Sequence, residues 1–141
     1  MKTLLPLLIA ICLAGCGGSG DSFAPQMQAL SLCDRPVTDP QEVSLIALIS
    51  NPREFSGQAI TVTGYYRHDF EHSAIYLHRD DAINSIAQNG LWVFGGVPES
   101  LRNRYVRISG IFNPESHGHM GAWPASICGV TTAVPWGKDA P

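Results

Sequence analysis

Hydrophobic and polar residues alternate in two segments of the chain, each long enough for one β-strand. In the first segment Ile60, Val62 and Tyr66 alternate with threonines and with Tyr65, and the run 106–112 repeats the same residue classes in nearly the same order. Alternation over β-branched and aromatic residues is typical of a half-buried strand. The pattern therefore predicts two long strands of one design.

Each of these two strands is interrupted by a glycine, Gly64 in the first and Gly110 in the second. A glycine inside a strand usually marks a bulge or a sharp bend. Bends of this kind allow a small sheet to coil and close on itself. We therefore expect a small β-barrel.

Three shorter strands are predicted at 73–78, 91–94 and 123–134, between turn-forming residues. Five strands with short helical insertions suit an OB-like barrel better than a sandwich, which needs about seven strands. The predicted fold class is mainly β, a small OB-like five-stranded barrel with one or two short helices. The loop at 113–121 precedes the last strand, and in OB folds this loop often overlies the binding face.

Two short helices are expected. The first begins near Thr38 and Pro40, which supply a capping residue and a residue suited to a first helical turn, and it ends before Asn51. The second follows Asp80 as its N-cap and carries Ile83 and Ile86 on one face.

The length and the N-terminal pattern divide the chain into a signal segment and one folded domain. The 141 residues, 45% hydrophobic, are enough for one modest core. Lys2 is followed by an apolar run at 4–13, which is too short to span a membrane and is typical of a secretory signal. The predicted organisation is a signal peptide at 1–15, a flexible tether at 16–29, an OB-like domain at 30–136 and a tail at 137–141.

The residues before Cys16 read Leu13-Ala14-Gly15. Together with Cys16 they resemble the bacterial lipobox, the recognition sequence of the lipoprotein signal peptidase. The resemblance implies acyl chains on Cys16, which would hold the protein on a membrane because each buried methylene contributes about 0.8 kcal/mol. It places the protein in the cell envelope, facing the periplasm. Gly17, where an aspartate would retain a Gram-negative lipoprotein in the inner membrane, favours the outer membrane.

Export also bears on the state of the cysteines. Of the four, Cys12 leaves with the signal and Cys16 carries lipid, so Cys33 and Cys128 remain. Export to an oxidising compartment favours a disulfide between them, and two free buried thiols are the alternative. Such a bridge would close almost the entire domain, a loop for which chain entropy gives about 4.7 kcal/mol.

Short motifs spread over the domain are Val43-Ser44-Leu45, Asn51-Pro52, Phe55-Ser56-Gly57, Val62-Thr63-Gly64-Tyr65, Phe70-Glu71, Ile75-Tyr76-Leu77, Leu91-Trp92, Tyr105-Val106 and His117-Gly118-His119-Met120-Gly121. Together they resemble a group of small, mostly uncharacterised bacterial proteins with an OB-like barrel. The resemblance covers nearly the whole domain. It implies the fold and no particular activity.

The charge balance disfavours a nucleic-acid partner. The formal net charge is −3, and loss of Lys2 with the signal leaves 8 basic against 12 acidic side chains, or −4. Nucleic-acid binders normally carry a basic stripe. Arg102, Arg104 and Arg107 are close together, but we interpret them as a solvated strand edge.

The sequence contains none of the common catalytic motifs, neither a nucleophile elbow, a phosphate-binding glycine loop, a Cys-x-x-Cys nor a His-Glu-x-x-His. Asp80 and Asp81 are adjacent, so their side chains diverge, and helix capping accounts for them better than catalysis. We therefore expect a protein that is not an enzyme, with an unrecognised envelope hydrolase as one alternative.

Histidines define a second alternative, a metal site. If the backbone is extended there, His117 and His119 point to one side and could bind one Zn2+ or Cu2+ with a third ligand from the first hairpin, Glu71 or His72. The simpler interpretation is that these histidines are loop and surface residues without a metal, and we expect no cofactor.

Aromatic residues offer a binding surface without a metal. Tyr65, Trp92 and Trp123, together with Tyr66 and Tyr76, could form a platform for a sugar, a peptide or a peptidoglycan fragment. The simpler interpretation is that most of them fill the core, because a barrel of this size has little else to pack. The sequence thus predicts a monomeric, membrane-anchored, non-catalytic binding module whose partner is an envelope protein or a small ligand.

Overall fold

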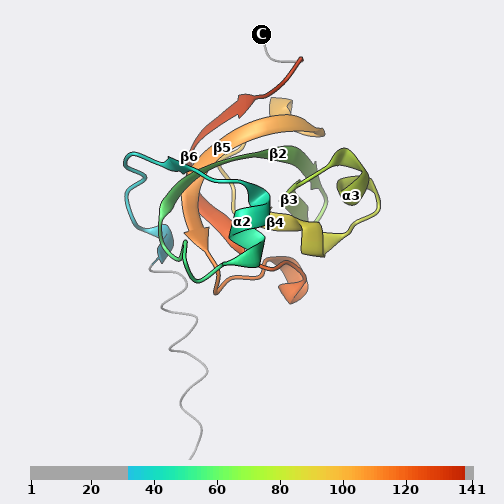
Figure 1. The fold of residues 1–141 in the computed structure, drawn as a ribbon. Coiled ribbons are helices and arrows are strands. Elements are labelled where there is room, and N and C mark those ends of the chain that lie inside the picture. The colour runs from blue at the N-terminus through green and yellow to red at the C-terminus, as the bar shows by residue number, and fades with distance from the viewer. Residues whose placement is uncertain (1–31, 139–141) are drawn as a thin grey trace, which may run out of the picture.

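The computed structural model describes residues 32–138, which fold into a mainly β structure with two short α-helices, α2 and α3 (Figure 1). The strands are β1 (Gln41–Glu42), β2 (Ala59–Asp69), β3 (His72–Tyr76), β4 (Gly90–Val93), β5 (Arg104–Asn113) and β6 (Ser126–Pro135). The helices are α2 (Leu45–Ser50) and α3 (Arg79–Ile83). The predicted signal peptide, Cys16 and tether lie outside the described residues.

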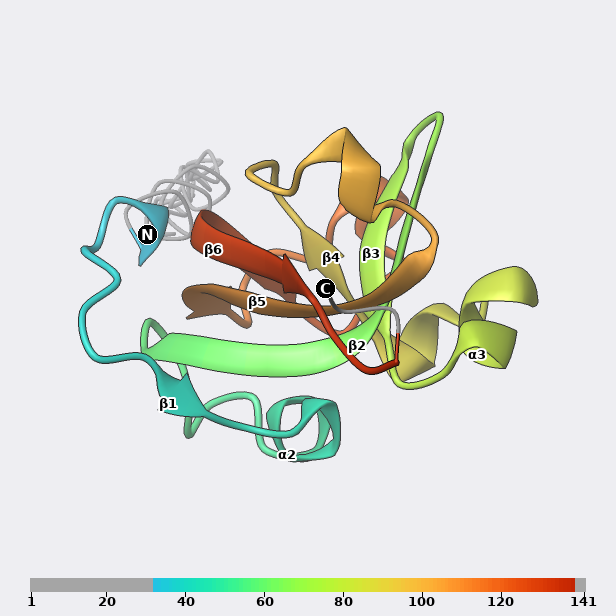
Figure 2. The same ribbon diagram turned by 90° about the horizontal axis from the view of Figure 1, so that it is seen from above.

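Five of the six strands close into a ring. β2 pairs with both β3 and β5, β3 pairs with β4, and β6 pairs with β4 and β5. All neighbours are antiparallel except β4 and β6, and β1 adds in parallel to β2 outside the ring. Seen from above, β1 and α2 lie on one side of β2, and α3 lies at the right of the view, away from β1 (Figure 2). All five predicted strands are present at the expected places, and β1 is an addition.

The alternation that predicted β2 separates two apolar clusters. Ile60, Val62 and Tyr66 are buried in the larger cluster, which the inward faces of the ring strands share with α2. The other face of β2 carries Tyr65, which belongs to a smaller cluster on the outside of the sheet with residues of β3, β4 and α3. The outer face of this sheet is therefore partly covered rather than fully solvated.

The two strand glycines serve different purposes. Gly110 lies at a register shift between β5 and β6, so the predicted irregularity is confirmed there. Gly64 stays in register with Val106, without a shift. A Cβ on Gly64 would lie 2.5 Å from the Tyr76 carbonyl oxygen and 2.7 Å from Leu45 of α2, so this glycine allows α2 to pack closely on the sheet.

The first helix begins later than its capping residues predicted. Its N-cap is Ser44, whose hydroxyl accepts a hydrogen bond from the Ala47 amide at 3.2 Å. The predicted start near Thr38 and Pro40 is wrong, because residues 41–42 pair with β2 instead. The amide of Val43 extends this pairing by donating to the Thr61 carbonyl at 2.9 Å. Backbone pairing at the free edge of β2 thus replaced the first helical turn.

The second helix also differs from its prediction. His78 is the N-cap, and its amide donates to the Asp81 carboxylate at 3.2 Å, so Asp80 lies inside the helix rather than at its cap. Ile83 and Ile86 are 56% and 40% exposed, and Ala82 is the helical residue that is buried. The helix is only five residues long, too short to present Ile83 and Ile86 on one face.

The predicted disulfide between Cys33 and Cys128 is confirmed. The two residues are 95 positions apart, and their Cα atoms lie 5.4 Å from each other. The bridge ties the start of the described chain to β6. Within residues 32–138, no helix combines the length and the apolar character that crossing a membrane requires.

Candidate functional site

The three aromatic residues predicted to bind a ligand do come together, on the outer face of β2, β3 and β4. Tyr65 lies opposite Tyr76 of β3, and Trp92 lies opposite Ala74, two positions before Tyr76 on the same strand. Trp123, from the β5–β6 loop (residues 114–125), packs against Trp92 with ring centroids 4.8 Å apart. Tyr65, Trp92 and Trp123 are only 8%, 9% and 7% exposed, however. They fill a small core under α3 and this loop rather than forming an open platform.

The β5–β6 loop is held against Trp92 and Trp123 by local contacts. The Nδ1 atom of His117 donates to the carbonyl oxygen of Trp123 at 3.0 Å. Gly118 lies so close to Trp92 that a Cβ there would be 2.5 Å from the indole ring. The ring of His119 stacks on the same indole with centroids 6.4 Å apart. The loop therefore covers the aromatic cluster in a defined conformation.

A contact between Glu71 and His119 joins this loop to the β2–β3 turn (residues 70–71). Their Oε2 and Nε2 atoms are 3.7 Å apart, and both side chains are substantially exposed. The turn and the loop come from opposite halves of the domain sequence. Their contact places both at one end of the outer face of β3 and β4.

The four residues of the predicted metal site are not assembled as ligands of one ion. His72 bonds through Nε2 to the Tyr76 hydroxyl at 3.0 Å and meets Trp123 edge-on, while the Nδ1 of His117 is taken by a backbone carbonyl. Glu71 and His119 approach each other without a third ligand. Over the described range 32–138, no group of three or more His, Cys, Asp or Glu side chains is placed to hold a metal.

Burial sets the protonation of the polar groups in this cluster. Removal from water lowers the pKa of His72, and the positive charge of Arg67 lowers it further. Burial raises the pKa of Tyr76, and the Trp123 indole N–H opposes this rise slightly. That N–H is buried but does not meet the geometry of a hydrogen bond to Tyr76 or to any other described group. The cluster is thus a neutral, largely apolar environment at neutral pH.

Exposed apolar side chains surround this covered cluster. Phe70 in the β2–β3 turn is 91% exposed, Met120 in the β5–β6 loop is 89% exposed, and Phe94 just after β4 is 47% exposed. Phe94 contacts Trp92 edge-on at 6.3 Å. Sequence reasoning assigned no binding role to any of these three residues. The sequence could have indicated Phe70 and Met120, because an apolar residue inside a turn or a glycine-rich loop is not expected to be buried.

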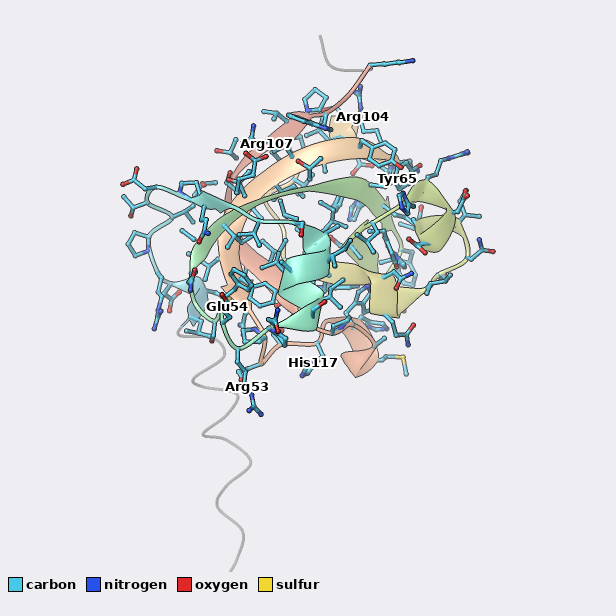
Figure 3. The ribbon with its side chains drawn as sticks, viewed as in Figure 1. Arg53, Glu54, Tyr65, Arg104, Arg107 and His117 are labelled. Carbon is cyan, nitrogen blue, oxygen red and sulfur yellow. A yellow bond between two sulfur atoms is a disulfide. The ribbon has the colours of Figure 1, made fainter. Side chains whose placement is uncertain are left out.

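The three clustered arginines do not form a basic stripe. Arg102 pairs with Glu99 at 2.5 Å, and Arg107 pairs with Glu42 at 2.9 Å while lying over the ring of Trp136. Arg104 and Arg107 lie at the opposite end of the molecule from His117 (Figure 3).

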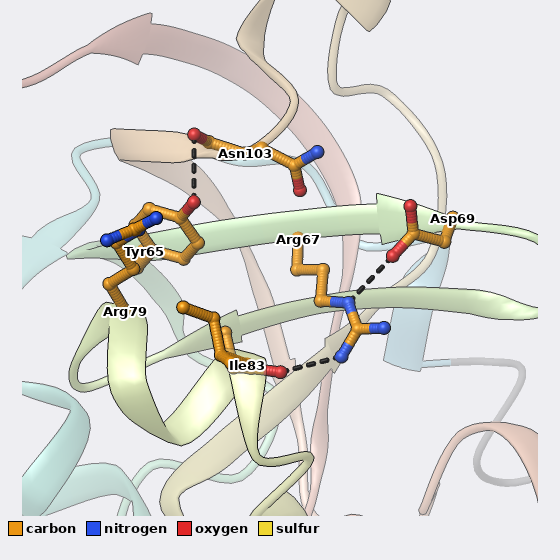
Figure 4. A pocket seen from close by; sticks show the side chains of 7 residues that line it. Tyr65, Arg67, Asp69, Arg79, Ile83 and Asn103 are labelled. Atoms are coloured by element: carbon orange, nitrogen blue, oxygen red, sulfur yellow. Dashed lines mark hydrogen bonds and ion pairs between the residues drawn. The ribbon is translucent and has the colours of Figure 1, made fainter.

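A pocket of about 390 Å³ lies between α3 and β2 and was not anticipated from the sequence (Figure 4). Its lining consists of Tyr65, Arg67, Asp69, Arg79, Ala82, Ile83 and Asn103. The Nε of Arg67 donates to the Asp69 carboxylate at 2.7 Å, and this hydrogen bond lowers the pKa of Asp69. We call this cavity the α3 pocket. No short stretch of the sequence indicates this pocket, because its lining residues come from three separate segments.

Comparison of the chain with protein-family models, with curated proteins and with solved structures found no match.

Proposed function

We propose that the chain is a lipid-anchored cell-envelope protein whose folded domain is a non-catalytic, OB-like binding module. The closed ring of five strands, with long first and fourth members and an irregularity at Gly110, supports an OB-like barrel. The lipobox-like residues before Cys16 support the anchor.

The observation that carries the proposal is the contact between Glu71 and His119. OB folds bind ligands on the face of their second and third strands, between the loop joining the first two strands and the loop joining the last two. The corresponding segments here are the β2–β3 turn and the β5–β6 loop, which this contact brings together at 3.7 Å. We define the binding face as the outer face of β3 and β4 with these two segments.

The chemistry of the binding face favours a protein partner in the envelope over a small ligand. Trp92 and Trp123 are covered, so they offer little surface to a sugar or a peptide fragment. Phe70 and Met120 instead project into solvent from the two loops, with Phe94 close to Trp92. Aromatic residues and methionine are enriched at protein interfaces. A surface that receives both loops would bury these side chains.

Site-specific photo-crosslinking in cells that produce the protein tests the binding face. A photoreactive phenylalanine analogue is introduced at Met120 or Phe94, and at Ile46 as a control, because Ile46 is 61% exposed on α2. The β2–β3 turn and α2 lie on opposite sides of the molecule in Figure 2. We expect one discrete adduct from Met120 and Phe94, absent from Ile46 and reduced by Phe70→Asp. Equal adducts at all three positions, or none at Met120 and Phe94, would contradict the proposal.

The anchor is tested separately. Cys16→Ala should abolish incorporation of labelled fatty acid and move the protein from the membrane fraction to the soluble fraction, because the acyl chains supply the membrane affinity. Density-gradient separation of the two membranes tests the outer-membrane assignment from Gly17. Unchanged labelling and fractionation of the Cys16→Ala protein would show that the lipobox interpretation is wrong, without bearing on the binding face.

A further inference from the structure

We propose that the α3 pocket is a second binding site, for a small organic anion whose carboxylate or phosphate group is held by Arg79 and whose apolar part lies against Tyr65 and Ile83. This site uses different residues from the binding face. It therefore does not depend on the partner proposed for that face.

The pocket is built from three segments that are separate in the sequence. Tyr65, Arg67 and Asp69 alternate along β2, so their side chains share one face of the strand. The helix α3 forms the facing wall, and Asn103, just before β5, closes one end. Figure 4 shows Arg79 on the same side of the pocket as Tyr65, with Arg67 further along β2. A volume of about 390 Å³ lies within the range of about 300–1,000 Å³ that small-molecule sites occupy.

Arg67 forms a fixed side of the pocket. Besides its bond to Asp69, its Nη1 donates to the Ala82 carbonyl at 2.6 Å and to the Ser85 hydroxyl at 3.1 Å. These bonds connect β2 to the end of α3 and restrain the guanidinium before any ligand arrives. The charge of Arg67 is balanced by Asp69, so Arg67 mainly shapes the site.

Arg79 provides the charge that has no counterpart. No hydrogen bond or ion pair joins its side chain to another group of residues 32–138, although the pocket also contains a carboxylate and a second guanidinium. The ionised lining groups are two arginines and one aspartate, giving a net charge of +1 at neutral pH. Guanidinium groups bind carboxylate and phosphate oxygens through paired, charge-assisted hydrogen bonds. An anionic group beside Arg79 would neutralise the pocket.

Apart from Asn103, the rest of the lining is apolar, and Tyr65 is fixed in position. The Tyr65 hydroxyl donates to the Asn103 carbonyl at 2.9 Å, and its ring is held edge-on by Tyr105 at 5.4 Å. Ile83 is 56% exposed at the mouth of the pocket, where it contributes little to the core. A ligand with an aromatic or aliphatic part would cover Ile83 and contact the Tyr65 ring. The combination selects an amphiphilic anion over a bare inorganic ion.

Titration of the full chain, purified in a mild detergent and labelled with 15N, tests the proposal. The probes are phenyl phosphate, benzoate and, as an uncharged control, benzyl alcohol. We expect saturable shifts of the amides of Tyr65 and α3 with at least one anion, at a dissociation constant below about 1 mM. Benzyl alcohol should bind at least tenfold more weakly. The difference between phenyl phosphate and benzoate identifies the preferred anionic group.

Two variants test whether Arg79 supplies the positive charge that binds the anion. Arg79→Gln should weaken binding of the better anion at least tenfold, about 1.4 kcal/mol. Arg53→Gln is the matched control, since Arg53 is also exposed and makes no side-chain ion pair or hydrogen bond within residues 32–138, but it points away from the pocket at the other end of the molecule (Figure 3). It should leave the affinity unchanged.

Three results would overturn the proposal. They are the absence of saturable shifts with both anions, an equal loss of affinity in Arg79→Gln and Arg53→Gln, and equal affinity for benzyl alcohol. A third variant, Ile83→Ser, tests the apolar part of the site and should weaken binding of phenyl phosphate several-fold without weakening binding of inorganic phosphate. None of these outcomes changes the crosslinks expected at Met120, so the two proposals fail independently.

Discussion

Gly118 is the residue on which the cover over the aromatic cluster depends most directly. Its φ is +66°, and a Cβ would lie 2.5 Å from the Trp92 ring, so Gly118→Ala must both strain the backbone and displace the loop. We expect a loss of about 2–3 kcal/mol in the free energy of unfolding, measured by urea denaturation. Gly121→Ala is the control, because Gly121 has a φ of +67° but nothing within 4 Å of its Cβ position. It should lose only about 1 kcal/mol. Equal losses would show that the contact with Trp92 does not matter.

His72 gives the same cluster a dependence on pH. Burial and the charge of Arg67 lower its pKa in the folded protein below the usual 6.5, so the folded state favours neutral imidazole. The contribution of His72 to the free energy of unfolding is therefore fully present above about pH 6.5. It is lost as the pH falls from there through the folded pKa, because the unfolded state takes up the proton more readily than the folded state does. The side chain is half-buried, so solvent screening keeps the effect small.

Denaturation curves at pH 7.5 and pH 5 measure this effect. The wild-type protein should lose more stability between the two values than His72→Gln does. The other histidines are present in both proteins, so the difference between the two losses belongs to His72. Identical losses, or a gain of wild-type stability at pH 5, would contradict the prediction.

At the scale of single residues, the sequence identified which aromatic groups gather and favoured a core role for them, but it did not place that core on the outer face of the sheet. Tyr65 and Trp92 follow from strand alternation, which is a local pattern. Their burial depends on α3 and on the loop that carries Trp123, and these segments pack through contacts between distant residues. For the same reason, the sequence did not anticipate that Phe70 and Met120 would remain the exposed apolar groups.

Secondary-structure elements were predictable where one local pattern acted alone. The strands repeat apolar residues every second position, and all five were placed correctly. The helix starts were wrong because several residues near each start can cap a helix, and tertiary pairing decides among them. Near α2, pairing of residues 41–42 with β2 moved the start to Leu45. Near α3, Asp81 rather than Asp80 accepts the hydrogen bond at the N-terminus of the helix.

Substitution of these two aspartates tests the assignment for α3. Asp81 accepts from the His78 amide at 3.2 Å and from the Asn89 side chain at 2.9 Å, so Asp81→Ala leaves two donors without their partner. We expect a loss of about 1 kcal/mol in the free energy of unfolding and faster amide hydrogen exchange in residues 78–89. Asp80→Ala should change stability by less than about 0.5 kcal/mol, because the carboxylate of Asp80 caps nothing. A larger effect from Asp80→Ala would restore the original prediction.

At the scale of the whole molecule, the closed ring followed from two long strands with interior glycines, but its exact form did not. Gly110 marks a true register shift, whereas Gly64 makes room for α2, and both give the same signal in the sequence. The α3 pocket was missed because strand, helix and turn contribute to it separately. The order of the strands depends on backbone pairing between segments that are distant in the sequence, so no short stretch of sequence predicts it.

The disulfide between Cys33 and Cys128 is the longest-range covalent constraint in the described part of the chain. Its loss should destabilise the entire domain. The two cysteines are 95 residues apart, so opening the bridge frees nearly all of the unfolded chain, for which the loop-closure model gives about 4–5 kcal/mol. We expect the variant with Cys33→Ser and Cys128→Ser to lose about 2–5 kcal/mol in the free energy of unfolding. This is a large part of the total of about 5–15 kcal/mol usual for a small domain. Dithiothreitol should lower the stability of the wild-type protein towards that of the variant and leave the variant unchanged. If the variant denatures at the same urea concentration as the oxidised wild type, the bridge does not stabilise the fold.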